Sequence, residues 1–285
     1  MVTLGALVEP ASRGPEPASV DVLIPTCDRP AALAVTLTSL ASQTFDRFRV
    51  IVSDQGDEPV LTSGEAAAVV RVLEAKGRQV EVLRNLPRRG MAQQRQFLLD
   101  RAQARYVLYL DDDVILEPDL LERLVEAIGE QRCGFVGSAL IGLSHVDDER
   151  PEEQHVEFWD GDVRPEEVKP GSAEWERYVL HNAANLYHLQ ERLGLSAAQG
   201  NEVQQPYKVA WVGGCVLYDA SALREVGGFR FHDQLPPDHA GEEVVAQARV
   251  MASHGGCALL PSGAYHQELP TRVEDRSCDA PQVLL

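Results

Sequence analysis

Tyr-Val-Leu-Tyr-Leu-Asp-Asp-Asp, residues 106–113, is the stretch of this sequence that decides the fold. Five apolar or aromatic residues in a row predict a buried strand, and three carboxylates follow that strand without a break. In open parallel sheets, ligands bind outside the carboxyl ends of the strands. We therefore expect the Asp triplet to lie at the mouth of a buried strand, where a ligand can reach it.

The triplet carries a chemical implication of its own. Three adjacent carboxylates repel one another, and a bound divalent cation is the usual physical reason for such a cluster. Hard oxygen ligands suit Mg²⁺ or Mn²⁺, which then bridge to phosphate oxygens. Alternate side chains of an extended segment share a face, so Asp111 and Asp113 are predicted to point together while Asp112 points elsewhere. A solvated acidic turn is the alternative, and the apolar strand in front of the triplet argues against it.

Strand and helix patterns alternate before and after the triplet. This alternation predicts a mostly parallel sheet with helices on its faces, an α/β fold. Strands are expected at Val20–Ile24, Phe48–Val52 and Val80–Leu83, and helices from Pro30 to about Ser42, at Ser63–Ala75, at Gly90–Arg101 and at Pro118–Ile128.

The second half is less regular. Residues 144–172 are rich in Asp, Glu and Pro and are expected to form a loop. Further on, the pattern predicts helices at Glu174–Leu193, Ser221–Val226 and Glu242–Ser253, an apolar segment at Lys208–Leu217 and a last strand at Cys257–Leu260.

Composition excludes several classes of partner. The chain has 285 residues and a formal net charge of −18, which argues against a nucleic acid or an anionic membrane as the main partner. No apolar run is long enough for a transmembrane helix. The leader at residues 1–19 lacks the features of a secretion signal, so a cytoplasmic location is expected; peripheral contact with a membrane stays open. The five cysteines show no CxxC spacing and are expected to be reduced thiols.

Two more polar clusters follow predicted strands. Pro25-Thr26-Cys27-Asp28 comes after the first strand, and Ser53-Asp54-Gln55-Gly56-Asp57 comes after the second. Because the carboxyl ends of parallel strands meet at one edge of a sheet, both clusters are predicted to lie beside the Asp triplet.

Six segments, taken in order, resemble the family 2 glycosyltransferases of the GT-A fold, and the resemblance covers residues from about 20 to 267. The segments are Val20–Arg29, Val50–Gly56, Arg89–Gln96, Tyr109–Asp119, Leu223–Phe229 and Gly241–Val245. The resemblance implies a nucleotide-sugar half at 20–118 and an acceptor half at 119–267, between a flexible leader at 1–19 and a tail at 268–285.

The resemblance also implies a chemistry, the inverting transfer of a hexosyl group from a nucleotide diphosphate, most commonly UDP, to an acceptor hydroxyl. The leaving diphosphate needs its growing charge neutralised, which a metal held by Asp111 and Asp113 does. The attacking hydroxyl must lose a proton to a carboxylate. Glu243 matches the position of the base, and Glu242 is the fallback. The family usually has Glu-Asp there, so the assignment between the two stays open.

The remaining predicted roles follow from matched positions. His266, just after the last strand, is a candidate ligand of the metal or the diphosphate. Trp211, close to Gly213-Gly214, is the expected sugar contact, whereas Trp175 and Tyr178 are expected to pack in the core. Arg88 and Arg89 are weaker candidates for the diphosphate. The expected contacts of the nucleotide-sugar are Pro25, Thr26, Asp28, Asp54, Arg95, Asp111, Asp112, Trp211, Gly213 and Gly214.

Two other readings of the sequence stay open. A phosphatase of the haloacid dehalogenase type also has an apolar strand that runs into a DxD motif, but its strand lies near the N-terminus. A GT-A domain that binds a nucleotide sugar without turning it over is the second. Neither the donor base, among UDP, TDP and GDP, nor the acceptor follows from the sequence.

Overall fold

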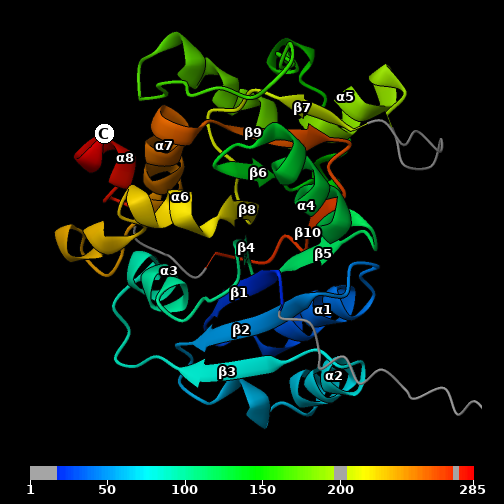
Figure 1. The fold of residues 1–285 in the computed structure, drawn as a ribbon, viewed down its shortest axis with the longest axis vertical. Coiled ribbons are helices and arrows are strands. Elements are labelled where there is room, and N and C mark those ends of the chain that lie inside the picture. Colours follow the sequence, from blue (N-terminus) through cyan, green and yellow to red (C-terminus); the bar gives the residue numbers. More distant parts are fainter. Residues whose placement is uncertain (1–17, 196–203, 272–275) are drawn as a thin grey trace, which may run out of the picture.

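An eight-stranded sheet forms the centre of the molecule in the computed structural model, which describes residues 18–195, 204–271 and 276–285 (Figure 1). The strand order is β3-β2-β1-β4-β8-β6-β9-β7. The strands are β1 (Val20–Thr26), β2 (Phe48–Asp54), β3 (Val80–Arg84), β4 (Tyr106–Leu110), β6 (Phe135–Gly137), β7 (Gln205–Tyr207), β8 (Cys215–Asp219) and β9 (Gly256–Leu260).

The direction of the strands confirms the predicted α/β class. Strands β1, β2, β3 and β4 run parallel, and so do β6 and β9, whereas β8 and β7 run antiparallel to their neighbours. Thr26 is therefore paired with Asp54 at the ends of β1 and β2. Because β8 runs the other way, the residues just before it lie at this same edge, beside the end of β4, where Leu110 is paired with Cys215.

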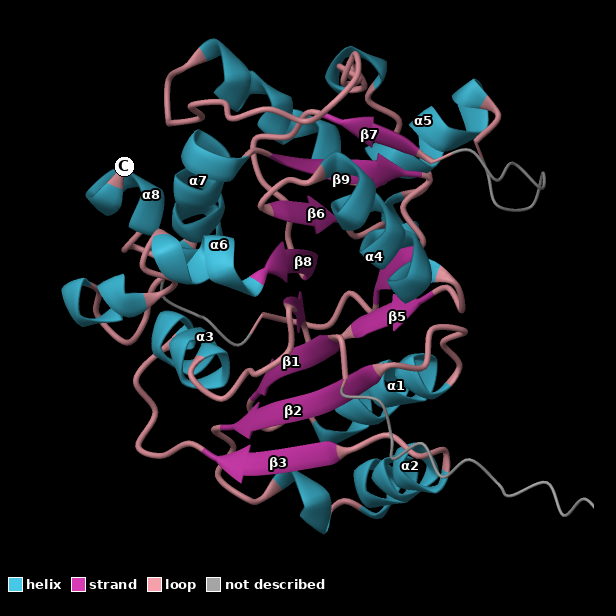
Figure 2. Ribbon diagram, in the orientation of Figure 1, coloured by secondary structure: helices cyan, strands magenta, loops and turns pink. Residues whose placement is uncertain are grey.

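Helices cover both faces of the sheet (Figure 2). Val22 and Ile24 of β1 contribute to one apolar cluster and Leu23 to the other, as expected of a strand buried on both faces. The helices α1 (Pro30–Ala41), α2 (Gly64–Ala75) and α4 (Leu120–Gln131) pack on the first face, and α3 (Met91–Leu99), α6 (Ala220–Glu225) and α7 (Glu242–His254) pack on the second.

A second, two-stranded sheet lies beside the triplet. Strand β5 (Val114–Leu116) pairs antiparallel with β10 (Ala264–His266), so that His266 is the partner of Val114. The next residue, Gln267, donates its backbone N–H to the carbonyl of Asp113 at 2.8 Å. This pairing brings His266 next to the triplet although about 150 residues separate them in sequence.

The irregular region contains the main departure from the predicted helices. A single helix over Glu174–Leu193 was wrong, because the chain forms a 3-10 helix at Ala173–His181 and then a separate helix, α5, at Asn185–Leu193. Between them Ala183 has a φ of 46°, in the left-handed region, which does not continue a helix. The preceding loop is irregular apart from two 3-10 turns at Leu143–His145 and Pro151–Glu153, as predicted.

The described part of the predicted tail packs on the domain. Helix α8 (Ala280–Leu284) contacts α7, and Ala280 is fully buried. The backbone N–H of Ala280 donates to the carbonyl of Ala240, whose own N–H donates to the carbonyl of Cys278. The end of the chain is therefore fastened next to the start of α7. The predicted leader lies outside the described residues up to position 17.

Two expectations from composition can be compared with the structure. All five cysteines lie within the described residues and none of them is in a disulfide; Cys133, Cys215 and Cys257 are buried. Across the described residues, every helix is too short or too polar to cross a membrane.

One buried ion pair links the first strands. Asp21 of β1 is 1% exposed and accepts two hydrogen bonds of 2.9 Å from the guanidinium of Arg49 on β2. It also accepts the backbone N–H groups of Gln103 and Ala104, in the turn before β4. One carboxylate thus joins three strands of the half that carries the triplet.

We predict that Asp21→Ala lowers the free energy of unfolding by about 3–5 kcal/mol, because it leaves the Arg49 charge and two amides without their partner. Urea denaturation followed by circular dichroism measures this change. Asp57→Ala is the control, since Asp57 pairs with Arg88 at an exposed position where an ion pair contributes little. Equal stability of the two variants would contradict the assigned role of Asp21.

Candidate active site

A pocket of about 770 Å³ opens at the carboxyl ends of the parallel strands. Its wall comes from the ends of β1 and β4, the segment before β8, the start of α7, the end of β10 and the last described part of the chain. Of the predicted site residues, Pro25, Thr26, Arg95, Asp111, Asp112, Asp113, Trp211, Gly213, Gly214, Glu242, Glu243 and His266 line it.

Asp28 and Asp54 are the predicted site residues that do not line this pocket. Asp54 is 1% exposed, and its carboxylate accepts the N–H groups of Gly56 and Val60 and pairs with Arg84 at 2.7 Å. Asp28 has a φ of 54° and accepts the N–H of Asp57 at 2.6 Å. Both carboxylates hold the loops together after β1 and β2, and their contact with a nucleobase stays a prediction.

Arg88 belongs to these loops as well. Its guanidinium donates to Asp28, Asp57 and the carbonyl of Gln55, and it does not line the pocket. The structure therefore shows Arg88 fastening the two loops to each other, whereas the sequence considered it for the diphosphate.

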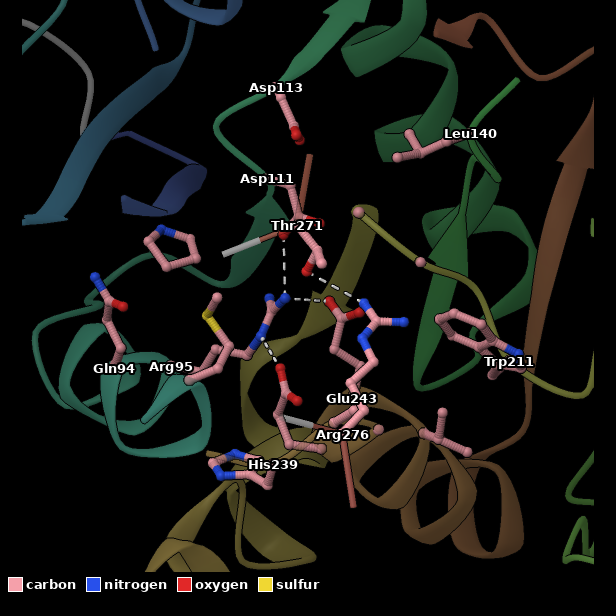
Figure 3. A pocket seen from close by; sticks show the side chains of 18 of the residues that line it. Gln94, Arg95, Asp111, Asp113, Leu140, Trp211, His239, Glu243, Thr271 and Arg276 are labelled. Carbon is pink, nitrogen blue, oxygen red and sulfur yellow. Dashed lines mark hydrogen bonds and ion pairs between the residues drawn. The ribbon is translucent and has the colours of Figure 1, made fainter. Parts of the chain in front are cut away.

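The three carboxylates of the triplet point to different partners. The hydroxyl of Thr26 donates to Asp112 at 2.7 Å, and the guanidinium of Arg29 donates to Asp113 at 2.7 Å and to Asp112 at 3.3 Å. Asp111 instead pairs with Arg95 at 3.1 Å. Figure 3 shows Asp111 and Asp113 both projecting into the pocket. Asp112 also lines the pocket, but its hydrogen bond with Thr26 turns its carboxylate toward β1, as the alternation of side chains predicts.

The surroundings separate the pKa values of two neighbouring carboxyls. Burial, together with the charge of Asp113, raises the pKa of Asp112 to about 7. Burial acts in the same direction on Asp113, but hydrogen bonds and charge from His266 and Arg29 outweigh it and lower the pKa of Asp113 below its usual value. Asp113 is therefore ionised at neutral pH, which a metal ligand must be.

His266 lies next to Asp113. The distance from its Nε2 to the carboxylate is 3.5 Å, and this contact raises the pKa of the imidazole. Over the residues that the structure describes, no three His, Cys, Asp or Glu side chains converge as they do around a fully protein-bound metal. Mg²⁺ and related ions usually take one or two carboxylates and complete their shell with water and phosphate oxygens. Asp113 and the nearby Asp111 could supply the carboxylates of such a partly open site, and His266 could join them once a bound ion displaces the proton that its raised pKa retains.

Arg95 is the centre of a second acidic group. It is 2% exposed on α3, and its guanidinium lies 3.1 Å from Asp111, 3.0 Å from Glu242 and 2.5 Å from Glu243 (Figure 3). Its Nη1 atom is buried and has no hydrogen-bond partner among the described residues. One cation therefore faces three carboxylates, with one donor atom still unused.

Glu243 is the more exposed of the two glutamates at the start of α7, with 14% of its side chain accessible against 8% for Glu242. Burial raises its pKa to about 8; Arg95 and the amide of Gly214 oppose this, and the charges of Asp111 and Glu242 add to it. Such a carboxyl is ready to exchange a proton near neutral pH.

The segment before β8 is shaped by glycine. Gly214 has a φ of 72°, and a Cβ atom there would lie 2.4 Å from Leu140 and 3.2 Å from the carboxylate of Asp111. Its carbonyl accepts the N–H of Asp111 at 2.9 Å. A larger residue would push this segment off Asp111, so Gly214 allows the backbone to approach both Asp111 and Glu243.

Sequence reasoning missed several residues of the wall. Arg29, next to the predicted Asp28, belongs to the site, because it joins the triplet and also donates to the carbonyl of Pro270. Arg276 reaches in from the end of the chain and donates to the hydroxyl of Thr271 at 3.4 Å (Figure 3). Arg29 stood inside a quoted motif and could have been found, whereas the predicted tail carried no signal.

Comparison with known proteins identifies the family to which the chain belongs. The family model described as glycosyl transferase family 2 matches residues 21–199. A search of curated proteins found no match.

Solved structures with a similar fold include TarS and a mannosyltransferase. Residues 1–349 of TarS from S. aureus superimpose with a TM-score of 0.54 at 14% identity, covering 87% of this chain and 60% of that one. Its complex with UDP-GlcNAc gives a TM-score of 0.53 at 15% identity, covering 90% and 60%. The mannosyltransferase PcManGT from Pyrobaculum calidifontis, in complex with GDP-Man and Mn²⁺, gives a TM-score of 0.53 at 16% identity, covering 90% and 59%.

The chain thus spans about 60% of the length of these structures, and at such identities the likeness concerns the GT-A fold. The family match covers more than half of the chain. The protein is a member of glycosyl transferase family 2.

Proposed function

We propose that this protein is an inverting glycosyltransferase that moves a hexosyl group from a nucleoside diphosphate to an acceptor hydroxyl with the help of Mn²⁺ or Mg²⁺. One observation carries the proposal. An ionised carboxylate beside an imidazole, Asp113 with His266, and a carboxyl of raised pKa, Glu243, face the same pocket. This combination supplies what binding of a metal diphosphate and removal of a proton both need.

Asp113 and His266 would hold the metal, with Asp111 as the third ligand. When bound, the ion would neutralise the charge that grows on the leaving diphosphate. Arg29 already supplies a positive charge to Asp112 and Asp113. Together with Arg276, it gives a chain of net charge −18 a local region that suits an anionic donor.

Glu243 is the proposed general base, and Arg95 is its positioning residue. The guanidinium of Arg95 fixes the carboxylate at 2.5 Å and keeps it on the pocket side of α7. The raised pKa makes Glu243 a better proton acceptor than an ordinary glutamate, which is poorly basic at neutral pH. Glu242, which is more buried and paired with Arg95 Nε, is the alternative base.

UDP is the proposed nucleotide. TarS has been solved in complex with UDP-GlcNAc and with UDP, and the mannosyltransferase PcManGT in complex with GDP-Man. Proteins of this fold therefore bind uracil and guanine nucleotides. Family membership rules against a haloacid dehalogenase phosphatase. Release of nucleoside diphosphate by the wild-type protein distinguishes an enzyme from a domain that binds a nucleotide sugar without turning it over. A cytoplasmic location and any peripheral contact with a membrane stay predictions.

Asp113→Ala is expected to abolish the metal-dependent part of UDP binding, because it removes the ionised carboxylate next to His266. Isothermal titration of UDP in the presence of Mn²⁺, and again with EDTA, measures that part. Asp160→Ala, at an exposed acid away from the pocket, is the matched control. If Mn²⁺ strengthens UDP binding to the Asp113 variant as much as to the wild type, the assigned metal site is wrong.

Glu243→Gln is expected to keep donor binding and to lower turnover by roughly 10²–10⁴-fold, since the amide cannot accept the proton. Release of nucleoside diphosphate from a panel of donors, with Mn²⁺ and a mixture of acceptors, measures turnover. Glu242→Gln, examined beside it, is expected to retain more activity. If Glu243→Gln stays fully active, Glu242 or another residue is the base; donor binding without turnover in the wild type would favour a binding domain.

A further inference from the structure

Three aromatic side chains stand in a row along one wall of the pocket. Tyr178 is stacked on Trp211, with ring centroids 5.6 Å apart and planes at 26°, and on Trp175, at 6.2 Å and 16°. Trp175 and Tyr178 belong to the 3-10 helix Ala173–His181, and Trp211 to the segment before β8. All three line the pocket, so the sequence-based expectation that Trp175 and Tyr178 pack in the core describes only part of their environment.

The three rings do not simply complete the apolar core, because part of their surface is exposed. Tyr178 is 40% exposed, which is unusual for an aromatic ring held between two others. Trp175 and Trp211 are only partly buried against the core. The indole N–H of Trp211 has no acceptor among the described residues, although buried indole groups normally find one. An aromatic surface that lines a pocket beside a few polar groups is typical of a ligand-binding wall.

The location of the three rings relative to Glu243 indicates which substrate would lie against them. A Cβ atom on Gly213 would lie 2.9 Å from the Trp211 ring, so that ring rests directly on the glycine segment. The next residue, Gly214, hydrogen-bonds Glu243 through its backbone and holds Asp111 in place. A molecule lying against the row therefore extends toward the carboxylate that takes the proton of the acceptor.

We propose that Trp175, Tyr178 and Trp211 form the acceptor subsite, and that the acceptor is a carbohydrate. The proposal rests on the glycosyltransferase function proposed above. The exposed part of Tyr178, with its hydroxyl, and the carboxylates of the same pocket suit a molecule that has both apolar C–H groups and many hydroxyls.

Intrinsic fluorescence can test the subsite directly. The chain has three tryptophans, and two of them are in the row. We expect methyl pyranosides or short oligosaccharides, titrated into the protein loaded with UDP and Mn²⁺, to cause a saturable change in emission. Tyr178→Ala is expected to weaken that response roughly tenfold, the effect of losing about one aromatic contact. Trp159→Phe, at a tryptophan that faces Lys208 outside the pocket, is expected to leave it unchanged.

Two results would overturn the proposal. The first is a saccharide response of undiminished affinity in both Tyr178→Ala and Trp211→Phe. The second is the lack of any saccharide response in the wild-type protein. This result overturns the proposal whether or not a simple phenol such as 2-naphthol shows saturable binding by saturation-transfer NMR. Calorimetric binding of UDP and Mn²⁺ to the same wild-type sample distinguishes the failures, because it persists when only the acceptor proposal is wrong and is lost when the proposed function is wrong.

Discussion

A single buried guanidinium organises the pocket. Arg95, on α3, binds Asp111 at the end of β4 and both glutamates at the start of α7, so it connects the two halves of the sheet at the site. Burial raises the pKa values of Asp111 and Glu243; the charge of Arg95 opposes this, and the neighbouring carboxylates add to it. The acidic centre can exist only because Arg95 is there, and any added cation or proton relieves it.

Carboxylates are also held together by positive charges in the second acidic centre, but there the pKa values of the two neighbouring carboxyls shift in opposite directions. Around Asp112 and Asp113, Arg29 and His266 provide the positive charge, and Asp113 stays ionised while Asp112 gains proton affinity. The two centres meet at the triplet, whose backbone is fixed by Gly214 on one side and Gln267 on the other. In the proposed reaction, the metal ligand Asp113 and the proton acceptor Glu243 therefore have opposite pKa shifts.

Much of the fold and of the candidate site could be predicted from the sequence, for physical reasons that differ from one region of the chain to another. Buried parallel strands have an apolar signal, so β1, β2, β3 and β4 and the meeting of their ends were predictable. Glu243 and His266 were found through motif position. Arg276 and α8 were missed as parts of the site because their contacts join segments far apart in the chain. The break at Ala183, with its left-handed φ, left no mark that single-sequence periodicity detects.

The central claim is that this pocket binds a nucleoside diphosphate through a divalent metal, and thermal unfolding of the wild-type protein tests it most directly. The account predicts that UDP or GDP raises the melting temperature only when Mn²⁺ is present, with a stabilisation of about 2.7 kcal/mol at a hundred times the dissociation constant. An equal rise in EDTA, or no rise with any nucleoside diphosphate and Mn²⁺, would contradict it.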